Sequence, residues 1–221
     1  MFKSSFFWFI KRIINTPAAA LIYSFALIST LTASNIAPNF IITLLSISLS
    51  IILFAIITAF DSASIFERAY IVYISSCPAK LWKLLLVIFT SYLLAYCPLA
   101  FVVMVFFWDA SIVAYFFVML AYLFFYLMLS FSIGILIKKA LTCMLILTML
   151  SFAPLLLSFI PRVAPLSYLE IFFGTLSPIT GLFLSVGLYS DSFYSILIGD
   201  LSVAFIFLIF SFYVCSKRDL C

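Results

Sequence analysis

The chain has 221 residues, of which 68% are hydrophobic and 8% are charged, and it carries a formal net charge of +4 at pH 7. Such a composition leaves no room for a water-soluble domain beside the apolar segments, so we expect residues 1–221 to form a single membrane-embedded domain. The sequence contains no histidine and no Gly-rich phosphate loop ending in Lys-Ser or Lys-Thr, which argues against an enzyme, a metal site, a cofactor site and ATP hydrolysis by the chain itself.

The first fifteen residues predict an amphipathic helix that lies on the membrane surface. Phe2, Phe6, Phe9, Ile10 and Ile13 fall on one side of this helix, and Lys3, Ser4, Lys11 and Arg12 fall on the other. Thr16 and Pro17 then provide an N-cap and a first-turn proline for the next helix. We therefore expect residues 1–15 to be an interfacial helix that leads into the first membrane span.

Six apolar stretches are each long enough to cross a bilayer, which needs roughly 20 apolar residues per helix. We place these spans at about 17–34, 39–60, 82–107, 111–137, 140–160 and 194–215. An alternative for the first stretch is a signal peptide, because Thr32-Ala33-Ser34 resembles a cleavage site. The fold class that we predict is an all-α membrane protein with six transmembrane helices.

Basic residues fall almost entirely on one side of this six-span topology. These residues are Lys3, Lys11, Arg12, Arg68, Lys80, Lys83, Lys138, Lys139, Lys217 and Arg218. Arg162 alone falls on the opposite side. The positive-inside rule makes the basic side cytoplasmic. We therefore expect a multi-pass protein of the cell membrane (plasma or inner membrane) with both termini in the cytoplasm.

The region 161–193 precedes the last span and is predicted to dip into the membrane from outside. Its stretch 171–188 is apolar but contains Gly174, Pro178, Gly181 and Gly187, and a full crossing there would place the basic C-terminal tail outside. Irregular backbone at membrane depth requires protein or water to satisfy its amides. A pair of re-entrant half-helices fits these features, and an amphipathic loop resting on the outer end of the bundle is the alternative.

The second to fifth spans contain no acidic or basic residue except Lys83 at the start of the third span, which disfavours an ion-coupled carrier. Asp200 in the last span is the one candidate for a charge on a translocation path. It follows Gly199 near the predicted outer end of that span, so it could instead cap a helix and interact with the helix dipole. The sequence favours the cap.

The cytoplasmic connection 61–80 combines charged residues with aromatic residues. Asp61, Glu67 and Arg68 stand close to Phe66, Tyr70, Tyr73 and Trp82 in the sequence. Aromatic anchors with a few charges are typical of protein interfaces, so we predict a helix that docks a soluble subunit. The alternative is a surface helix that its aromatic side chains merely anchor at headgroup level.

The order of these parts resembles the type-2 exporter permeases of the ATP-binding-cassette superfamily. Phe66-Glu67-Arg68, then Ser76-Cys77-Pro78 and Lys83, are similar to the loop of that family between its second and third spans. Leu176-Ser177-Pro178-Ile179-Thr180 is similar to the family's Asn-Pro outer segment, with serine in place of asparagine. The resemblance covers nearly the whole chain.

The resemblance implies a transport function and several partners. Two permease copies, identical or paralogous, would form one transporter in the lipid bilayer, each with a separate ATPase subunit, and no nucleic acid would bind. The implied ATPase-coupling residues are Asp61, Phe66, Glu67, Arg68, Tyr70 and Tyr73, and the implied outer gate contains Ser177, Pro178 and Gly181. Residues 1–14 would be the connecting helix. Alternatives are the membrane subunit of haem-associated cytochrome c maturation and a membrane scaffold that transports nothing.

Overall fold

The computed structural model describes residues 2–17, 19–24, 27–28, 40–67, 81–106, 110–158 and 190–217, and these residues are helical with short turns and no strand. The helices are α1 (Phe2–Ile14), α3 (Phe40–Glu67), α5 (Leu81–Phe106), α6 (Ala110–Ile137), α7 (Ala140–Ser158) and α10 (Ser190–Lys217). Residues 17, 19–24 and 27–28 are also helical and lie within the first predicted span. The prediction of an all-helical protein is confirmed for this part of the chain.

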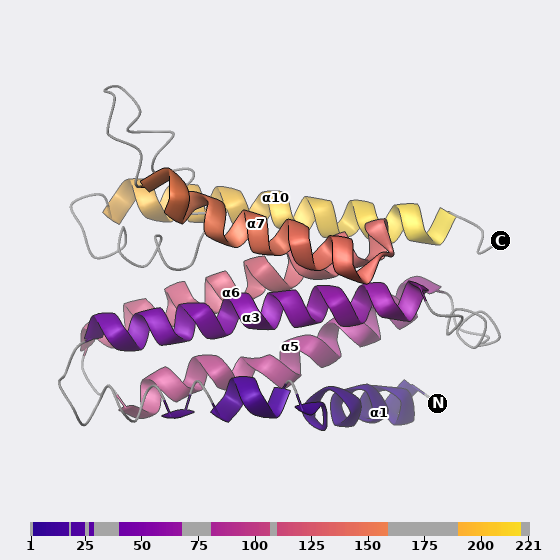
Figure 1. The fold of residues 1–221 in the computed structure, drawn as a ribbon, viewed down its shortest axis with the longest axis horizontal. Coiled ribbons are helices and arrows are strands. Elements are labelled where there is room, and N and C mark those ends of the chain that lie inside the picture. The colour runs from indigo at the N-terminus through magenta and orange to yellow at the C-terminus, as the bar shows by residue number, and fades with distance from the viewer. Residues whose placement is uncertain are drawn as a thin grey trace.

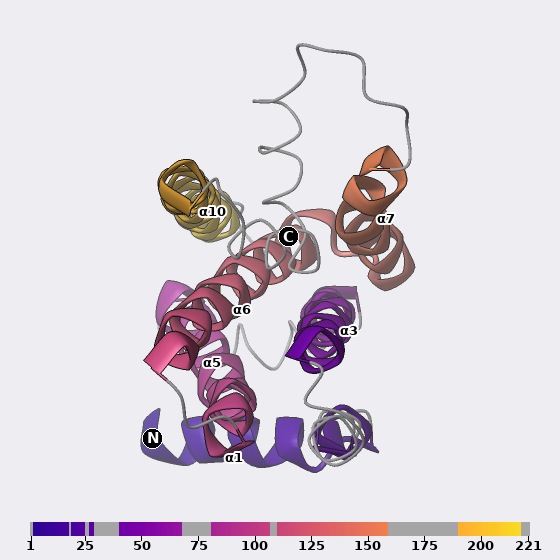
Figure 2. The same cartoon turned by 90° about the vertical axis from the view of Figure 1, so that its left-hand side faces the viewer.

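The long helices lie side by side along one axis, and α1 lies across them (Figures 1 and 2). Helix α6 is central because it packs against α3, α5, α7 and α10. Helix α1 packs against α5 at the edge of this bundle. An amphipathic helix that crosses the direction of its neighbours is the arrangement expected for a helix in the membrane surface.

Three helical stretches in the described residues are long and apolar enough to cross a membrane. They are Ser48–Ile65 in α3, Phe117–Ile137 in α6 and Leu197–Cys215 in α10. Helices α5 and α7 contribute the shorter apolar stretches Trp82–Pro98 and Ala140–Phe152. A membrane protein is therefore plausible from its helices, whereas the full set of six spans remains a prediction. The predicted re-entrant segment lies outside the described residues up to residue 189.

Consecutive long helices alternate in direction, so the junctions with basic residues gather at one end of the bundle. The start of α1, the end of α3, the α6–α7 junction and the end of α10 all lie at the right-hand end in Figure 1. Lys138 and Lys139 occupy the α6–α7 junction, where Lys138 adopts a left-handed conformation with φ of 58° and its N–H bonds the carbonyl of Gly134 at 3.1 Å. For the described residues, this clustering agrees with the charge asymmetry that the sequence predicted. The side of a membrane on which it lies stays a prediction.

Helix α3 continues well beyond the predicted end of the second span near residue 60. It ends at Glu67, so Asp61 and the serines that follow lie on the helix rather than in the predicted loop 61–80. Ser62 Oγ bonds the carbonyl of Ala59 at 3.1 Å, and Ser64 Oγ bonds the carbonyl of Asp61 at 2.8 Å. These hydroxyl groups therefore satisfy their hydrogen bonds on the backbone of the same helix.

Large aromatic side chains fill the centre of the bundle. The largest fully buried ones are Tyr92, Tyr96, Tyr122, Tyr126, Phe54 and Phe131, which come from α3, α5 and α6. The rings of Tyr92 and Tyr96 stack with centroids 6.3 Å apart, and the ring of Phe131 lies 6.2 Å from that of Tyr92. Aromatic pairs at such separations stabilise a core beyond the area that they bury.

The crossing of α3 and α6 is close because small residues meet there. Ala59, Ser62 and Ala63 of α3 are fully buried against Gly134 of α6. A Cβ atom at Gly134 would lie 3.0 Å from Ser62 Cβ and 3.1 Å from the Ala59 carbonyl oxygen, and it would overlap Ser62 Oγ. Small side chains at membrane helix crossings allow such backbone approach. Gly134 is therefore required by this contact.

Substituting Gly134→Ala should destabilise the protein by about 1–3 kcal/mol, because the added methyl group overpacks the α3–α6 crossing. Gly199→Ala is the matched control, since no atom lies within 4 Å of a Cβ built there. That control should be neutral or stabilising by up to about 1 kcal/mol from its helix propensity. Detergent unfolding followed by circular dichroism measures both. Equal effects of the two substitutions would contradict the close crossing.

Candidate functional site

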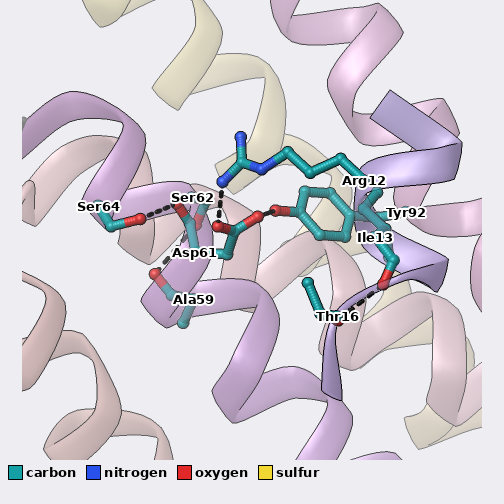
Figure 3. Close-up of polar contacts among 8 residues, drawn as sticks. All are labelled: Arg12, Ile13, Thr16, Ala59, Asp61, Ser62, Ser64 and Tyr92. Atoms are coloured by element: carbon teal, nitrogen blue, oxygen red, sulfur yellow. Dashed lines mark hydrogen bonds and ion pairs between the residues drawn. The ribbon is translucent and has the colours of Figure 1, made fainter. Parts of the chain in front are cut away.

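Three side chains from three helices meet in one polar cluster, which we name the Arg12–Asp61–Tyr92 cluster (Figure 3). Arg12 of α1 forms an ion pair with Asp61 of α3, with 2.5 Å between Arg12 Nη2 and Asp61 Oδ1. The hydroxyl of Tyr92 of α5 donates a hydrogen bond to the other carboxylate oxygen, Oδ2. Both oxygens of this carboxylate therefore have a donor, which is the condition for burying a charged group.

The cluster is partly buried. The side chains of Arg12 and Asp61 are 32% and 24% exposed, and Tyr92 is 2% exposed. Charge-assisted hydrogen bonds in such surroundings are stronger than those at an open surface, because water screens them less. The Arg12 guanidinium also lies 5.9 Å from the centre of the Trp8 ring on the same helix. Arg12 thus contributes both a cation–π contact and an ion pair.

The turn at Thr16, between α1 and the helical residues that follow, positions Arg12 beside Asp61. Thr16 Oγ1 donates to the carbonyl of Ile13 at 2.7 Å and accepts from the N–H of Ala19 at 3.3 Å. The N–H of Ala20 bonds the carbonyl of Thr16 at 3.2 Å, which begins the next helix. The predicted N-cap at Thr16 is confirmed. Because this cap ends α1 and starts the following helix, the basic last turn of α1 faces the end of α3.

Helix direction explains how Tyr92 reaches Asp61. Side chains on a helix tilt toward its N-terminus, so the Tyr92 ring leans toward the end of α5 that adjoins the end of α3. Its stacking with Tyr96 and its contact with Phe131 fix the ring in this direction. Thr58, one turn before Asp61, forms a side-chain hydrogen bond with Tyr96. The α3–α5 contact is therefore polar over two successive turns.

The contacts of the cluster join three helices. Helix α1 packs across α5, whereas the Arg12–Asp61 pair joins α1 to α3. The described residues contain no group of three or more His, Cys, Asp or Glu side chains that could hold a metal ion. The cluster can transmit a displacement of one helix end to the other two.

The structure describes three of the predicted ATPase-coupling residues, and all three lie on α3. Asp61 lies within α3 and its carboxylate is bonded inside the chain, while Phe66 and Glu67 form the last residues of that helix. The remaining predicted residues lie outside the described part, namely Arg68, Tyr70, Tyr73, Ser177, Pro178 and Gly181. Binding of an ATPase by any of these residues stays a prediction.

The interpretation of Asp200 as a helix cap is wrong. Helix α10 begins at Ser190, so Asp200 lies about three turns inside it. Its side chain is buried, with 6% exposure. The Gly199-Asp200 pair suggested a helix start. Helix α10 instead continues through Gly199, with apolar residues before and after it in one uninterrupted helix.

The sequence reasoning missed two members of the cluster. Arg12 was recognised only as part of the polar face of the first helix, although it was the cation nearest the predicted end of that helix. Tyr92 gave no signal, because one tyrosine within an apolar span is normally a packing residue. Both residues are recognised once the structure brings them to Asp61, which is 49 and 31 positions away from them.

Comparisons with family models, with curated proteins and with solved structures gave no match to this chain.

Breaking the ion pair should destabilise the bundle, and the two partners should be coupled. Arg12→Gln and Asp61→Asn should each lower the free energy of unfolding, and the double variant should lose about 1.5–3 kcal/mol less than their sum, the range for hydrogen bonds to charged groups. Tyr92→Phe, which keeps the stacked ring, should cost about 1 kcal/mol. Unfolding of the wild type, the two single variants and the double variant of the ion pair in one detergent measures the coupling. Strictly additive losses would show that the pair contributes nothing.

Proposed function

We propose that this chain is the membrane-embedded permease subunit of an ATP-binding-cassette exporter that a separate ATPase subunit drives. The supporting features are the apolar helices, the clustering of basic junctions at one end of the bundle, and the amphipathic helix that lies across it. The order of these parts agrees with the resemblance drawn from the sequence. Two such subunits, identical or paralogous, would enclose the transport path.

The observation that carries the proposal is the position of the Arg12–Asp61–Tyr92 cluster. Asp61 lies less than two turns before Glu67, the last residue of α3 and the first charged residue of the implied docking motif. A force applied to this end of α3 therefore reaches Asp61 along a continuous helix. From there the ion pair leads to α1 and the Tyr92 hydrogen bond leads to α5.

This connection suggests how ATP could change the bundle. Closure of the ATPase pair would displace the ends of α3 in the two permeases, and the cluster would make α1 and α5 move with α3. Nucleotide can shift the equilibrium between two conformations of the transporter only by the difference in its affinity for them. The role of the cluster is to make the docking loop and the bundle change conformation together. Asp61 accordingly acts inside the permease, while Phe66 and Glu67 are the proposed contacts with the ATPase.

Phe66→Ala combined with Glu67→Gln should separate the permease from its ATPase without unfolding it. Loss of an aromatic anchor at an interface typically costs about 2 kcal/mol or more, which is about a thirtyfold loss of affinity. Phe60→Ala is the matched control, because Phe60 lies on the same helix before the docking motif and is 40% exposed. Affinity purification of each tagged variant from native membranes, with mass spectrometry of retained ATPase subunits, gives the answer. Unchanged retention by the double variant would refute the docking role.

The native cysteines test the sidedness that the proposal requires. Cys77 lies in the predicted cytoplasmic connection and Cys221 at the C-terminus, whereas Cys143 and Cys215 are buried in the bundle. A membrane-impermeant maleimide should label Cys77 and Cys221 only after sealed cells are opened, and the two buried thiols should stay unlabelled until the protein unfolds. Labelling of Cys77 in sealed cells would place the docking motif outside and end the proposal.

A further inference from the structure

The buried face of α10 contains an acidic residue within an otherwise small and apolar stripe. Leu197, Asp200, Ala204, Leu208, Ser211 and Cys215 repeat at intervals of three or four residues and are all buried. Because α10 packs mainly against α6, this stripe is the face that α6 covers. Asp200 lies in the stretch Leu197–Cys215, which is long and apolar enough to cross a membrane. Ionisable side chains in such a position are costly and mark functional sites.

Tyr122 of α6 lies opposite Asp200. Helices α6 and α10 run in the same direction, and each residue lies about three turns from the start of its helix, so the two are at similar depth. Their side chains interact electrostatically. Tyr122 is fully buried, and its hydroxyl has no hydrogen-bond partner in the described structure. A buried hydroxyl without a partner is uncommon and calls for an explanation.

The neighbouring groups limit what could bind there. Tyr126, one turn further along α6, interacts with Tyr122. Helix α5 also touches α10, and the described charged side chain of α5 is Lys83, which is exposed beside Trp82 at the basic end of the bundle. Leu197 and Ala204 flank Asp200 along α10 and are 4% and 2% exposed. In an interface packed this closely, a proton is the cation that needs no additional volume.

We propose that Asp200 and Tyr122 form a proton-binding site between α6 and α10. The carboxyl holds a proton while the two helices are in contact, because an ionised carboxylate at this depth would lack water. Release of the proton requires water to enter between the two helices, and the Tyr122 hydroxyl then donates a hydrogen bond to the carboxylate. Occupancy of the site is thereby linked to the packing of α6 on α10. This linkage does not depend on an ATPase partner.

A hydrophobic carbodiimide tests the site in the intact protein. Dicyclohexylcarbodiimide enters membranes and reacts with protonated carboxyl groups. The carboxyl oxygen bonds to the central carbon of the reagent while the proton passes to one of its nitrogens, and the adduct rearranges to a stable N-acylurea. Asp61 serves as an internal comparison, because its carboxylate is paired with Arg12 and should react little. Peptide mapping by mass spectrometry locates the modified residue.

The full chain in native membranes should be modified at Asp200. Between about pH 5 and about pH 9 the reaction should pass through a midpoint, above which its rate falls about tenfold per pH unit with the protonated fraction. Asp200→Asn should remove the labelled peptide. Tyr122→Phe should keep the labelling but move its midpoint to higher pH, because the carboxylate loses its hydrogen-bond donor.

The outcomes that would overturn the site are equally definite. Absence of labelling at Asp200 in the folded wild-type protein, or a rate that does not change over the whole pH range, would show that no proton is exchanged there. An unchanged midpoint in Tyr122→Phe would show that the pair does not act as one site. These readings need no ATPase and no transported substrate, so they stand apart from the tests of the permease proposal.

Discussion

The structure depends on the compensation of one negative charge, that of the Asp61 carboxylate. Asp61 is the first acidic residue after a long apolar stretch of α3, and it lies in a segment that is apolar enough to enter a membrane. An isolated charge there would be expelled toward water. Arg12 and Tyr92 supply a cation and a hydroxyl to its two oxygens, so the helix continues past it instead of ending. The same contacts fix α1 and α5 against α3.

This compensation also explains why α1 lies across the bundle. Its apolar side packs on α5, and Arg12 extends from its last turn to Asp61. At the same end of the bundle, Lys83 lies 5.6 Å from the ring centre of Trp82 and Lys217 lies 4.9 Å from that of Tyr213. Partly exposed aromatic rings beside cations favour the headgroup region of a bilayer. The cluster thus lies just inside the layer in which we place α1.

Hydropathy was sufficient to predict the helices, since long apolar runs and the basic residues between them are local features. The end of α3 was not predictable in the same way. Asp61 resembled a loop residue because its partner Arg12 is 49 positions distant, and no pattern near Asp61 indicates that a cation neutralises it. Asp200 was misread for the converse reason, because Gly199 suggested a boundary that the apolar residues around it override. Long-range pairing thus decided the position of Asp61, and the apolar residues of the same helix decided that of Asp200. The docking residues after Glu67 lie outside the described residues, and their role stays a prediction.

The two acids illustrate how surroundings set the chemistry of identical side chains. Asp61 lies at the basic end of the bundle, where Arg12 and Tyr92 bond its two oxygens and give the residue a structural role. Asp200 lies deep between α10 and α6 near the hydroxyl of Tyr122, a group that can donate one hydrogen bond and carries no positive charge. A phenol can stabilise a carboxylate but cannot neutralise it. The first acid therefore holds helices together, whereas the second favours their contact only while it holds a proton, so any motion that separates α6 from α10 must also change the charge between them.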